Sequence, residues 1–122
     1  MRVLVVEDDE IFRQFLTEIL EDRAIEVVQS PDGVAGYEKA RSAPYDLIIL
    51  DVRTPGLLGT EIAEALKQND PGIRIILISA FADETLRKSA VKLRMPLLSK
   101  PFSADDLFQV IDEAKDTLDL SS

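Results

Sequence analysis

The chain has 122 residues, enough for one domain with a sizeable hydrophobic core. Its 23 acidic and 14 basic residues give a net charge of −9, which argues against direct binding of a nucleic-acid backbone, because such binding requires a basic face. The chain has no Cys and no His, which excludes disulfides, thiolate chemistry, His-based metal sites and Ser-His-Asp triads, and its apolar runs are too short to span a membrane.

Five short apolar runs recur along the chain, and each predicts a β-strand. They cover residues 3–6, 25–28, 47–50, 73–78 and 96–98. The first, third and fourth are rich in Val, Ile and Leu with little alternation, which is typical of strands covered on both faces. Glu26 lies inside the second run and Pro96 begins the fifth, so we expect these two strands at the edges of a sheet.

Helical spacing of apolar residues fills the intervals between the strands. The predicted helices cover residues 11–20, 31–40 and 60–67, a segment from about Asp83, and a segment to Leu118. We expect the second helix to begin with Ser30 as its N-cap and Pro31 in its first position. In the last, Ser103 is the predicted N-cap and Asp106 occupies the capping-box position.

Strand and helix thus alternate five times, which predicts a parallel α/β sheet with right-handed crossovers and helices on both faces. With runs one, three and four central, the flavodoxin-like, doubly wound order 2-1-3-4-5 fits. No linker or internal repeat is visible, so we expect residues 1–122 to form a single domain, with its core in about residues 2–118. The N-terminus lacks the length of a signal peptide, and we expect a cytoplasmic protein.

Polar residues follow four of the predicted strands. They are Glu7, Asp8 and Asp9, then Asp51, then Ser79, which Ala80 follows, and finally Ser99 and Lys100, which Pro101 follows. In an open parallel sheet the carboxyl ends of the strands meet at the ligand-binding edge. Crowded carboxylates repel unless a cation lies among them, and hard oxygen ligands suit Mg²⁺. Since Mg²⁺ and a lysine can neutralise a phosphoryl group while a carboxylate attacks it, the pattern indicates phosphoryl transfer onto an Asp.

Each of these residues also has a simpler structural explanation. Acids after strands often cap helices, and this explains Asp9, Glu10 and Asp32 better than a ligand role does. For Asp51 alone, the two explanations are balanced. Because four strand ends together supply carboxylates, a hydroxyl and an ammonium, a functional site explains the whole set better than separate helix caps do. No glycine-rich loop follows the first strand, which argues against dinucleotide binding and against a P-loop.

The segments VLVVEDDE, DLIILDVRTPG, ILISA and LLSKPF, in this order and spacing, resemble the receiver domain of bacterial two-component response regulators. The resemblance runs from about Arg2 to Leu118. It implies that Asp51 accepts a phosphoryl group from a sensor histidine kinase or a histidine phosphotransfer protein. It also implies a site for Mg²⁺, with Mn²⁺ as an alternative, formed by Asp8, Asp51 and the backbone carbonyl of Arg53, with help from Glu7.

The resemblance further implies how a signal would leave the site. Lys100 would contact the phosphoryl group, and would pair with the acids when that group is absent. The Ser79 hydroxyl would bind the phosphoryl group, draw in the loop that begins at Ala80, and change the surface of the fourth helix, fifth strand and fifth helix for a downstream target. Pro101 would follow a cis peptide bond that aims the lysine. The first helix would dock the kinase.

Three departures from the family pattern stand out. Leu97 occupies the place of the switch aromatic, and Phe102 is a poor substitute because it follows the lysine. Leu58 replaces the usual Asp before Gly59, which favours either a partner contact or loop packing. Residues 92–95 replace a small and acidic turn, so we expect a short or mobile fourth helix.

We therefore expect a phosphorylation-dependent signalling switch, a phosphoacceptor that promotes its own phosphorylation and dephosphorylation rather than a turnover enzyme. A degenerate receiver that binds a protein without phosphorylation remains an alternative, as does a domain excised from a hybrid kinase or a transcription factor. An aspartyl phosphatase is disfavoured because Arg53 stands where a second acid would protonate the leaving group. We expect no binding to nucleic acid or membranes by this domain, and either a monomer or a phosphorylation-dependent dimer.

Overall fold

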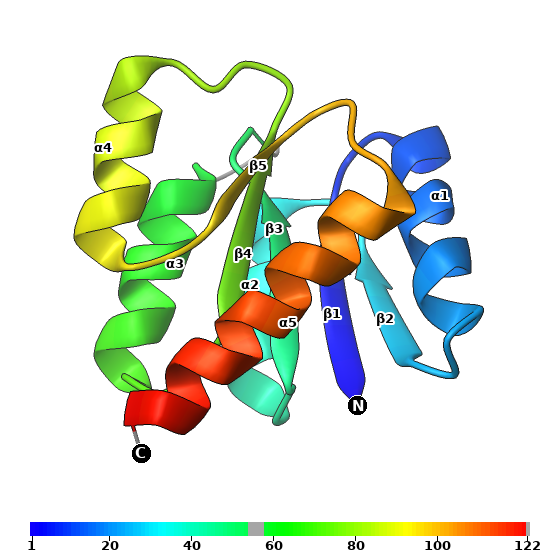
Figure 1. The fold of residues 1–122 in the computed structure, drawn as a ribbon, viewed down its shortest axis with the longest axis horizontal. Coiled ribbons are helices and arrows are strands. Elements are labelled where there is room, and N and C mark those ends of the chain that lie inside the picture. Colours follow the sequence, from blue (N-terminus) through cyan, green and yellow to red (C-terminus); the bar gives the residue numbers. More distant parts are fainter. Residues whose placement is uncertain (54–57, 122) are drawn as a thin grey trace.

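A computed structural model places five short strands side by side in one parallel sheet, in the order β2-β1-β3-β4-β5 (Figure 1). The structure describes residues 1–53 and 58–121, with side chains as far as residue 113. The strands are β1 (Arg2–Val6), β2 (Glu26–Ser30), β3 (Leu47–Asp51), β4 (Ile75–Ser79) and β5 (Leu97–Ser99). The predicted flavodoxin-like order, with the second and fifth strands at the edges, is confirmed.

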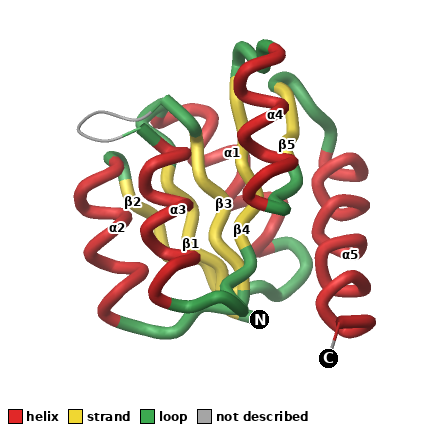
Figure 2. Tube along the Cα trace, turned by 90° about the vertical axis from the view of Figure 1, so that its left-hand side faces the viewer, coloured by secondary structure: helices red, strands yellow, loops and turns green. Residues whose placement is uncertain are grey.

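In the described part of the chain, five helices alternate with the strands and cover both faces of the sheet (Figure 2). They are α1 (Glu10–Glu21), α2 (Gly33–Ser42), α3 (Gly59–Asn69), α4 (Glu84–Leu93) and α5 (Ala104–Ser121). Side chains of α2, α3 and α4 pack on one face, and side chains of α1 and α5 pack on the other. None of the described helices is both long enough and apolar enough to cross a membrane.

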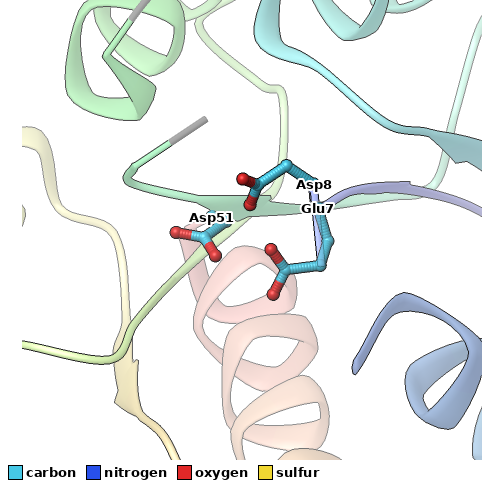
Figure 3. Close-up of side chains that lie close together, drawn as sticks. All are labelled: Glu7, Asp8 and Asp51. Atoms are coloured by element: carbon cyan, nitrogen blue, oxygen red, sulfur yellow. The ribbon is translucent and has the colours of Figure 1, made fainter. Parts of the chain in front are cut away.

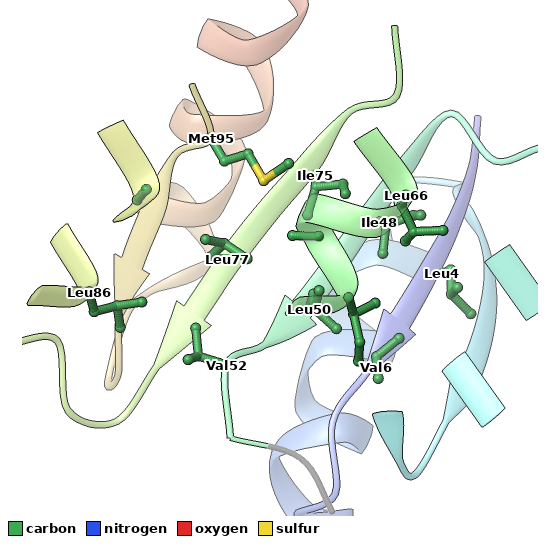
Figure 4. Close-up of a cluster of buried hydrophobic side chains, with 13 residues drawn as sticks. Leu4, Val6, Ile48, Leu50, Val52, Leu66, Ile75, Leu77, Leu86 and Met95 are labelled. Carbon is green, nitrogen blue, oxygen red and sulfur yellow. The ribbon is translucent and has the colours of Figure 1, made fainter. Parts of the chain in front are cut away.

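The central strands are apolar on both faces because both faces are covered. In β1, Leu4 and Val6 belong to the core cluster under α2, α3 and α4 (Figure 4), whereas Val3 and Val5 belong to the cluster under α1 and α5. All four side chains are at most 1% exposed, and burying a side chain of this size stabilises the fold by about 1.5–3 kcal/mol. This double cover explains why these strands read as continuous apolar runs.

Three helices begin at an Asp whose carboxylate accepts a backbone hydrogen bond. Asp9 Oδ1 accepts the N–H of Phe12 at 3.1 Å, and Asp32 Oδ1 accepts the N–H of Ala35 at 2.7 Å. The helix-start role expected for Asp9 and Asp32 is thus confirmed; Glu10 lies in the first turn of α1. Asp83 caps α4 in the same way, as its predicted start requires.

The prediction that Ser30 caps the second helix, with Pro31 in its first position, is wrong. Ser30 is the last residue of β2, because its carbonyl accepts the N–H of Glu7 at 3.0 Å and so extends the sheet. The helix starts later, at the carboxylate of Asp32. Ser30 and Asp32, two residues apart, could each have capped this helix, and the register of the sheet decides between them.

Local hydrogen bonds define the end of α4 and the start of α5. The backbone of Arg94 is left-handed (φ 58°), and its N–H bonds back to the carbonyls of Ala90 and Val91, which ends α4. We expected a short or mobile fourth helix, and α4 has 10 residues, which makes it and α2 the shortest of the described helices. At the start of α5, Ser103 and Asp106 form the predicted capping box, with both bonds at 3.1 Å. The side chains beyond residue 113, including that of Leu118 at the predicted end of this helix, lie outside the described residues.

Candidate functional site

The register of the sheet brings the polar strand ends together. Val6 of β1 pairs with Leu50 of β3, so the residues that follow them, Glu7 and Asp51, are neighbours at the carboxyl edge. β5 lies next to β4, with Ser79 of β4 paired with Ser99 of β5. The carbonyl of Ser79 accepts the N–H of Lys100 at 2.8 Å. The side chains that the sequence places after four strands therefore lie at one edge of the sheet.

Three carboxylates form a cluster at this edge (Figure 3). One oxygen from each of Glu7, Asp8 and Asp51 lies within 4.8 Å of the other two. Glu7 is fully buried and Asp51 is 5% exposed, whereas Asp8 is exposed. The cluster thus has two acids inside the protein and one that meets solvent.

Lys100 supplies a positive charge to this cluster. Its Nζ lies 2.7 Å from Asp51 Oδ2 and also donates a hydrogen bond to Glu7 Oε1. The lysine side chain is 16% exposed, so these ion pairs are only partly screened by water. One ammonium therefore joins the carboxyl ends of β1, β3 and β5.

Burial and crowding change the acidity of the two partners of Asp51. Burial raises the pKa of Glu7 from 4.5 to about 8, and its hydrogen bond with Asp51 adds to the rise, while Lys100 partly opposes it. For Lys100, burial alone would lower the pKa, but the hydrogen bonds and charges of Asp51 and Glu7 outweigh it and raise the pKa. The lysine therefore stays charged, and the raised pKa of Glu7 reflects how poorly this buried site tolerates negative charge.

The residues at this edge fit a hard divalent cation. Three carboxylates, when ionised, face one ammonium, which leaves an excess of negative charge. Carboxylate oxygens are the ligands that Mg²⁺ prefers, and Asp8 leaves the cluster open to the water molecules that Mg²⁺ retains.

The backbone around Asp51 holds its carboxylate in place. Asp51 Oδ1 accepts the N–H of Arg53, two residues further along the chain, at 2.8 Å. Its hydrogen bond therefore stabilises the turn after β3 and does not cap a helix. The N–H of Gly59 donates to the carbonyl of Val52 at 2.7 Å, which brings the start of α3 against the end of β3. A Cβ at Gly59 would lie 2.6 Å from Val52 Cα and 2.7 Å from the carbonyl oxygen of Asp51.

The remaining predicted residues surround the cluster. Ser79 is buried, and its Oγ accepts the N–H of Phe81 at 3.0 Å; Ala80 is exposed. The Lys100–Pro101 peptide bond is cis, as the resemblance implies. Leu97 is partly buried against the core cluster under α2, α3 and α4. The departure at Leu58 is a 52% exposed side chain in the N-cap position of α3, where it offers no cap bond.

Sequence reasoning missed two contributions from α1. Arg13 Nη1 donates to the backbone carbonyl of Glu7 at 2.8 Å, and its Nε donates to Gln29 Oε1 of β2 at 3.1 Å. The ring of Phe12 lies over the ammonium of Lys100. The contact of Arg13 has a weak signal in the sequence, because Arg13 lies in the first turn of a helix that directly follows the acidic residues 7–9. Helical periodicity places Phe12 only on the apolar face.

The comparisons with known proteins agree with this arrangement. The model of the response regulator receiver domain family matches residues 3–112 of the chain. The chain belongs to this family. The receiver domain is 33% identical over 113 residues to the response regulator receiver protein CpdR of Brucella abortus, and the match covers 92% of this chain and 94% of that protein.

Two further relatives show the range of proteins that contain this domain. A hybrid signal transduction histidine kinase of Dictyostelium discoideum is 38% identical over 108 residues, which are 86% of this chain but 7% of that protein. The response regulator protein TrrA from Thermotoga maritima, solved in complex with Mg²⁺-BeF, superposes with a TM-score of 0.84 at 30% identity, covering 93% of this receiver domain and 97% of that chain. The family's function is that of a phosphorylation-dependent signalling switch, with which this receiver domain is consistent.

Proposed function

We propose that this receiver domain accepts a phosphoryl group on Asp51 from a phosphohistidine donor and signals by the change in surface that follows. One observation carries the proposal: a nearly buried carboxylate, Asp51, lies beside two other carboxylates and bonds to the ammonium of Lys100. The acids supply a nucleophile and cation ligands, and the lysine supplies a fixed positive charge. This combination suits phosphoryl transfer, in which catalysis consists mainly of positioning and charge neutralisation.

The transfer exchanges one bond to phosphorus for another. A carboxylate oxygen of Asp51 bonds to phosphorus as the bond from phosphorus to the donor imidazole nitrogen breaks, and that nitrogen keeps the electron pair and takes a proton from solvent. Lys100 then moves its hydrogen bonds from the carboxylates to the new phosphoryl oxygens, which carry more charge. Attack by water on phosphorus later releases inorganic phosphate and restores the Asp51 carboxylate.

The residues at this edge would hold Mg²⁺, with Mn²⁺ as an alternative. Asp8, Asp51 and the backbone carbonyl of Arg53 would be ligands, and Glu7 would assist. When bound, the cation would neutralise charge on the transferring phosphoryl group. Support comes from the carboxylate oxygens within 4.8 Å of one another and from the Mg²⁺-BeF complex of the TrrA relative.

We assign the switch to Ser79. Its Oγ accepts the N–H of Phe81, and its hydroxyl proton has no acceptor among the described residues. That proton would go to the phosphoryl group on Asp51, which would draw the loop from Ala80 inward. The change would reach the surface of α4, β5 and α5. With Leu97 in the place of an aromatic side chain, it would spread through core packing rather than through rotation of a ring.

We further propose the setting in which the switch works. The phosphodonor is a sensor histidine kinase or a histidine phosphotransfer protein that docks on α1, and the target is a protein rather than a nucleic acid or a membrane. Residues 1–122 act in the cytoplasm as one domain, either as a monomer or as a phosphorylation-dependent dimer. The net charge of −9 supports the exclusion of nucleic acid.

The decisive experiment measures intact mass after incubation with Mg²⁺ and acetyl phosphate. We expect one phosphate adduct on the parent protein and none on Asp51→Asn. The matched control is Asp70→Asn at the C-terminal end of α3, which should gain the adduct normally. A parent protein without an adduct would reject the proposal in favour of phosphorylation-independent binding. An adduct on Asp51→Asn equal to that of the parent would reject the assignment to Asp51.

A further inference from the structure

The ammonium of Lys100 has an aromatic neighbour as well as two carboxylate partners. Its Nζ lies 4.4 Å from the ring centroid of Phe12 in α1. A cation over a ring face is attracted by the electrons of that face, and the attraction grows as water is removed. Here the lysine side chain is only 16% exposed. Water therefore weakens this attraction less than it would at an exposed site.

Two other rings hold Phe12 in this position. Phe102 meets it edge to face, with the centroids 5.3 Å apart and the planes at 86°, and Phe15 lies 5.6 Å away. Phe102 is buried and follows Lys100 by two residues. The three rings thus connect α1 to the segment that carries the lysine, and they fix the ring that faces its ammonium.

The position of Lys100 matters because its side chain is long and flexible. A free lysine loses much rotamer freedom when its ammonium is held in one place. The bonds to Asp51 and Glu7 hold it in the structure described here. Once Asp51 carries a phosphoryl group those bonds must rearrange, whereas the ring of Phe12 can keep its contact. A side chain such as Leu would fill the same space without attracting the charge.

We propose that Phe12 is a positioning residue for phosphoryl transfer: its ring face keeps the ammonium of Lys100 directed at the carboxyl edge of the sheet. The inference rests on the proposed function, since it assigns Phe12 to the reaction through Lys100. It also goes beyond the sequence pattern, in which Phe12 is simply one apolar residue of the first helix.

Three variants test the proposal. Phe12→Leu removes the ring, and Phe12→Tyr keeps it. Phe108→Leu is the matched control, because Phe108 is a buried ring in the same core cluster whose own cation contact, 3.6 Å from centroid to guanidinium carbon, is with Arg23. Phe108→Leu is thus the same substitution as Phe12→Leu, and it also removes a contact between a cation and a ring, but one that does not involve Lys100.

Two measurements distinguish positioning from a general structural role. The first is the rate of phosphorylation by acetyl phosphate at saturating Mg²⁺. We expect Phe12→Leu to be about three to ten times slower than the parent, and Phe12→Tyr to restore the rate. The second is the NMR shift of the Lys100 Cε protons without phosphate donor, which the Phe12 ring should displace upfield in the parent and in Phe12→Tyr but not in Phe12→Leu. Phe108→Leu should leave the rate and the shift unchanged.

Each contrary result has its own meaning. Parental rate and parental Lys100 shifts in Phe12→Leu would overturn the positioning role while the proposed function stands. Equal slowing in Phe108→Leu would also overturn it, because the effect would then be one of general stability. A parent protein that takes up no phosphate would reject the proposed function and this inference together.

Discussion

Lys100 and Asp51, which lie 49 residues apart in the chain, are joined by a hydrogen bond of 2.7 Å from Nζ to Oδ2. The same ammonium also bonds to Glu7, so one cation serves two buried acids. This sharing leaves the exposed carboxylate of Asp8 without that cation as a partner and makes the site a favourable place for added positive charge.

The first prediction concerns stabilisation by Mg²⁺. Because the cation should bind the folded cluster and not the unfolded chain, Mg²⁺ at ten times its dissociation constant should raise the free energy of unfolding by about 1.4 kcal/mol. Asp8→Ala should abolish this gain. Its own cost without Mg²⁺ should stay within about 0.5 kcal/mol, because Asp8 is exposed. Urea unfolding with and without Mg²⁺ measures both.

Asp105→Ala is the control for this measurement, since Asp105 is also exposed and lies at the start of α5 outside the cluster. It should keep the full response to Mg²⁺. A response that survives in Asp8→Ala would show that the cation binds elsewhere.

The second prediction concerns pH and Glu7. The pKa of Glu7 is about 8 in the folded protein and 4.5 in an unfolded chain, so between these limits the folded state holds a proton that the unfolded state has lost. The free energy of unfolding should therefore fall as pH rises from about 5 to about 8, by roughly 2–4 kcal/mol from this group. The groups that face Glu7 are Asp51, Lys100 and Asp8.

Chemical denaturation at several pH values, in chelator to remove cations, tests this dependence. Glu7→Gln is neutral at every pH and should flatten the profile between these limits, while Glu64→Gln on the exposed face of α3 should follow the parent. If Glu7→Gln and the parent show the same slope, the raised pKa of Glu7 is wrong.

The third prediction concerns Gly59. In Gly59→Ala the new methyl group would lie 2.6 Å from Val52 Cα and 2.7 Å from the Asp51 carbonyl oxygen, and backbone atoms cannot yield as a flexible side chain can. We expect a loss of about 2–4 kcal/mol in the free energy of unfolding, and slower phosphorylation, because the end of β3 must shift.

Gly72→Ala is the matched control for this substitution. Its nearest neighbour would be Asp70 Oδ1 at 3.6 Å, an ordinary van der Waals contact. Stability should change by less than about 0.5 kcal/mol. Equal stability losses in the two variants, measured by urea unfolding, would refute the steric explanation.

The fourth prediction separates phosphorylation from signalling. Ser79→Ala lacks the hydroxyl proton but keeps Asp51, Lys100 and the acids, so it should still gain the phosphate adduct. Backbone NMR shifts of α4 and β5 should then change less on phosphorylation than in the parent. Ser79→Thr keeps the hydroxyl and should keep the shift changes. A full response in Ser79→Ala would assign the switch to another group.

Much of the fold was predictable because its causes are local. Runs such as residues 47–50 are apolar at every position, which is typical of a strand covered on both faces, and Asp83 and Ser103 mark helix starts through bonds that span three residues. The strand order followed from the edge features of two runs. The cap of α2 was not predictable in this way, because Ser30 and Asp32 both suit it and a bond from Glu7 to Ser30 settles the choice.

The meeting of Glu7, Asp51 and Lys100 was likewise predictable, since parallel strands bring the residues at their carboxyl ends to one edge. The properties of these groups were not. The pKa of Glu7 depends on how completely packing excludes water from it, and the contact between Phe12 and Lys100 depends on how α1 and the segment after β5 meet. The sequence by itself determined which segments form strands and helices, their order and the polar residues that follow the strands, because these follow from short-range bonding and periodic burial. Tertiary structure alone decided charge states and contacts between distant residues, because desolvation and orientation exist only once the chain has packed.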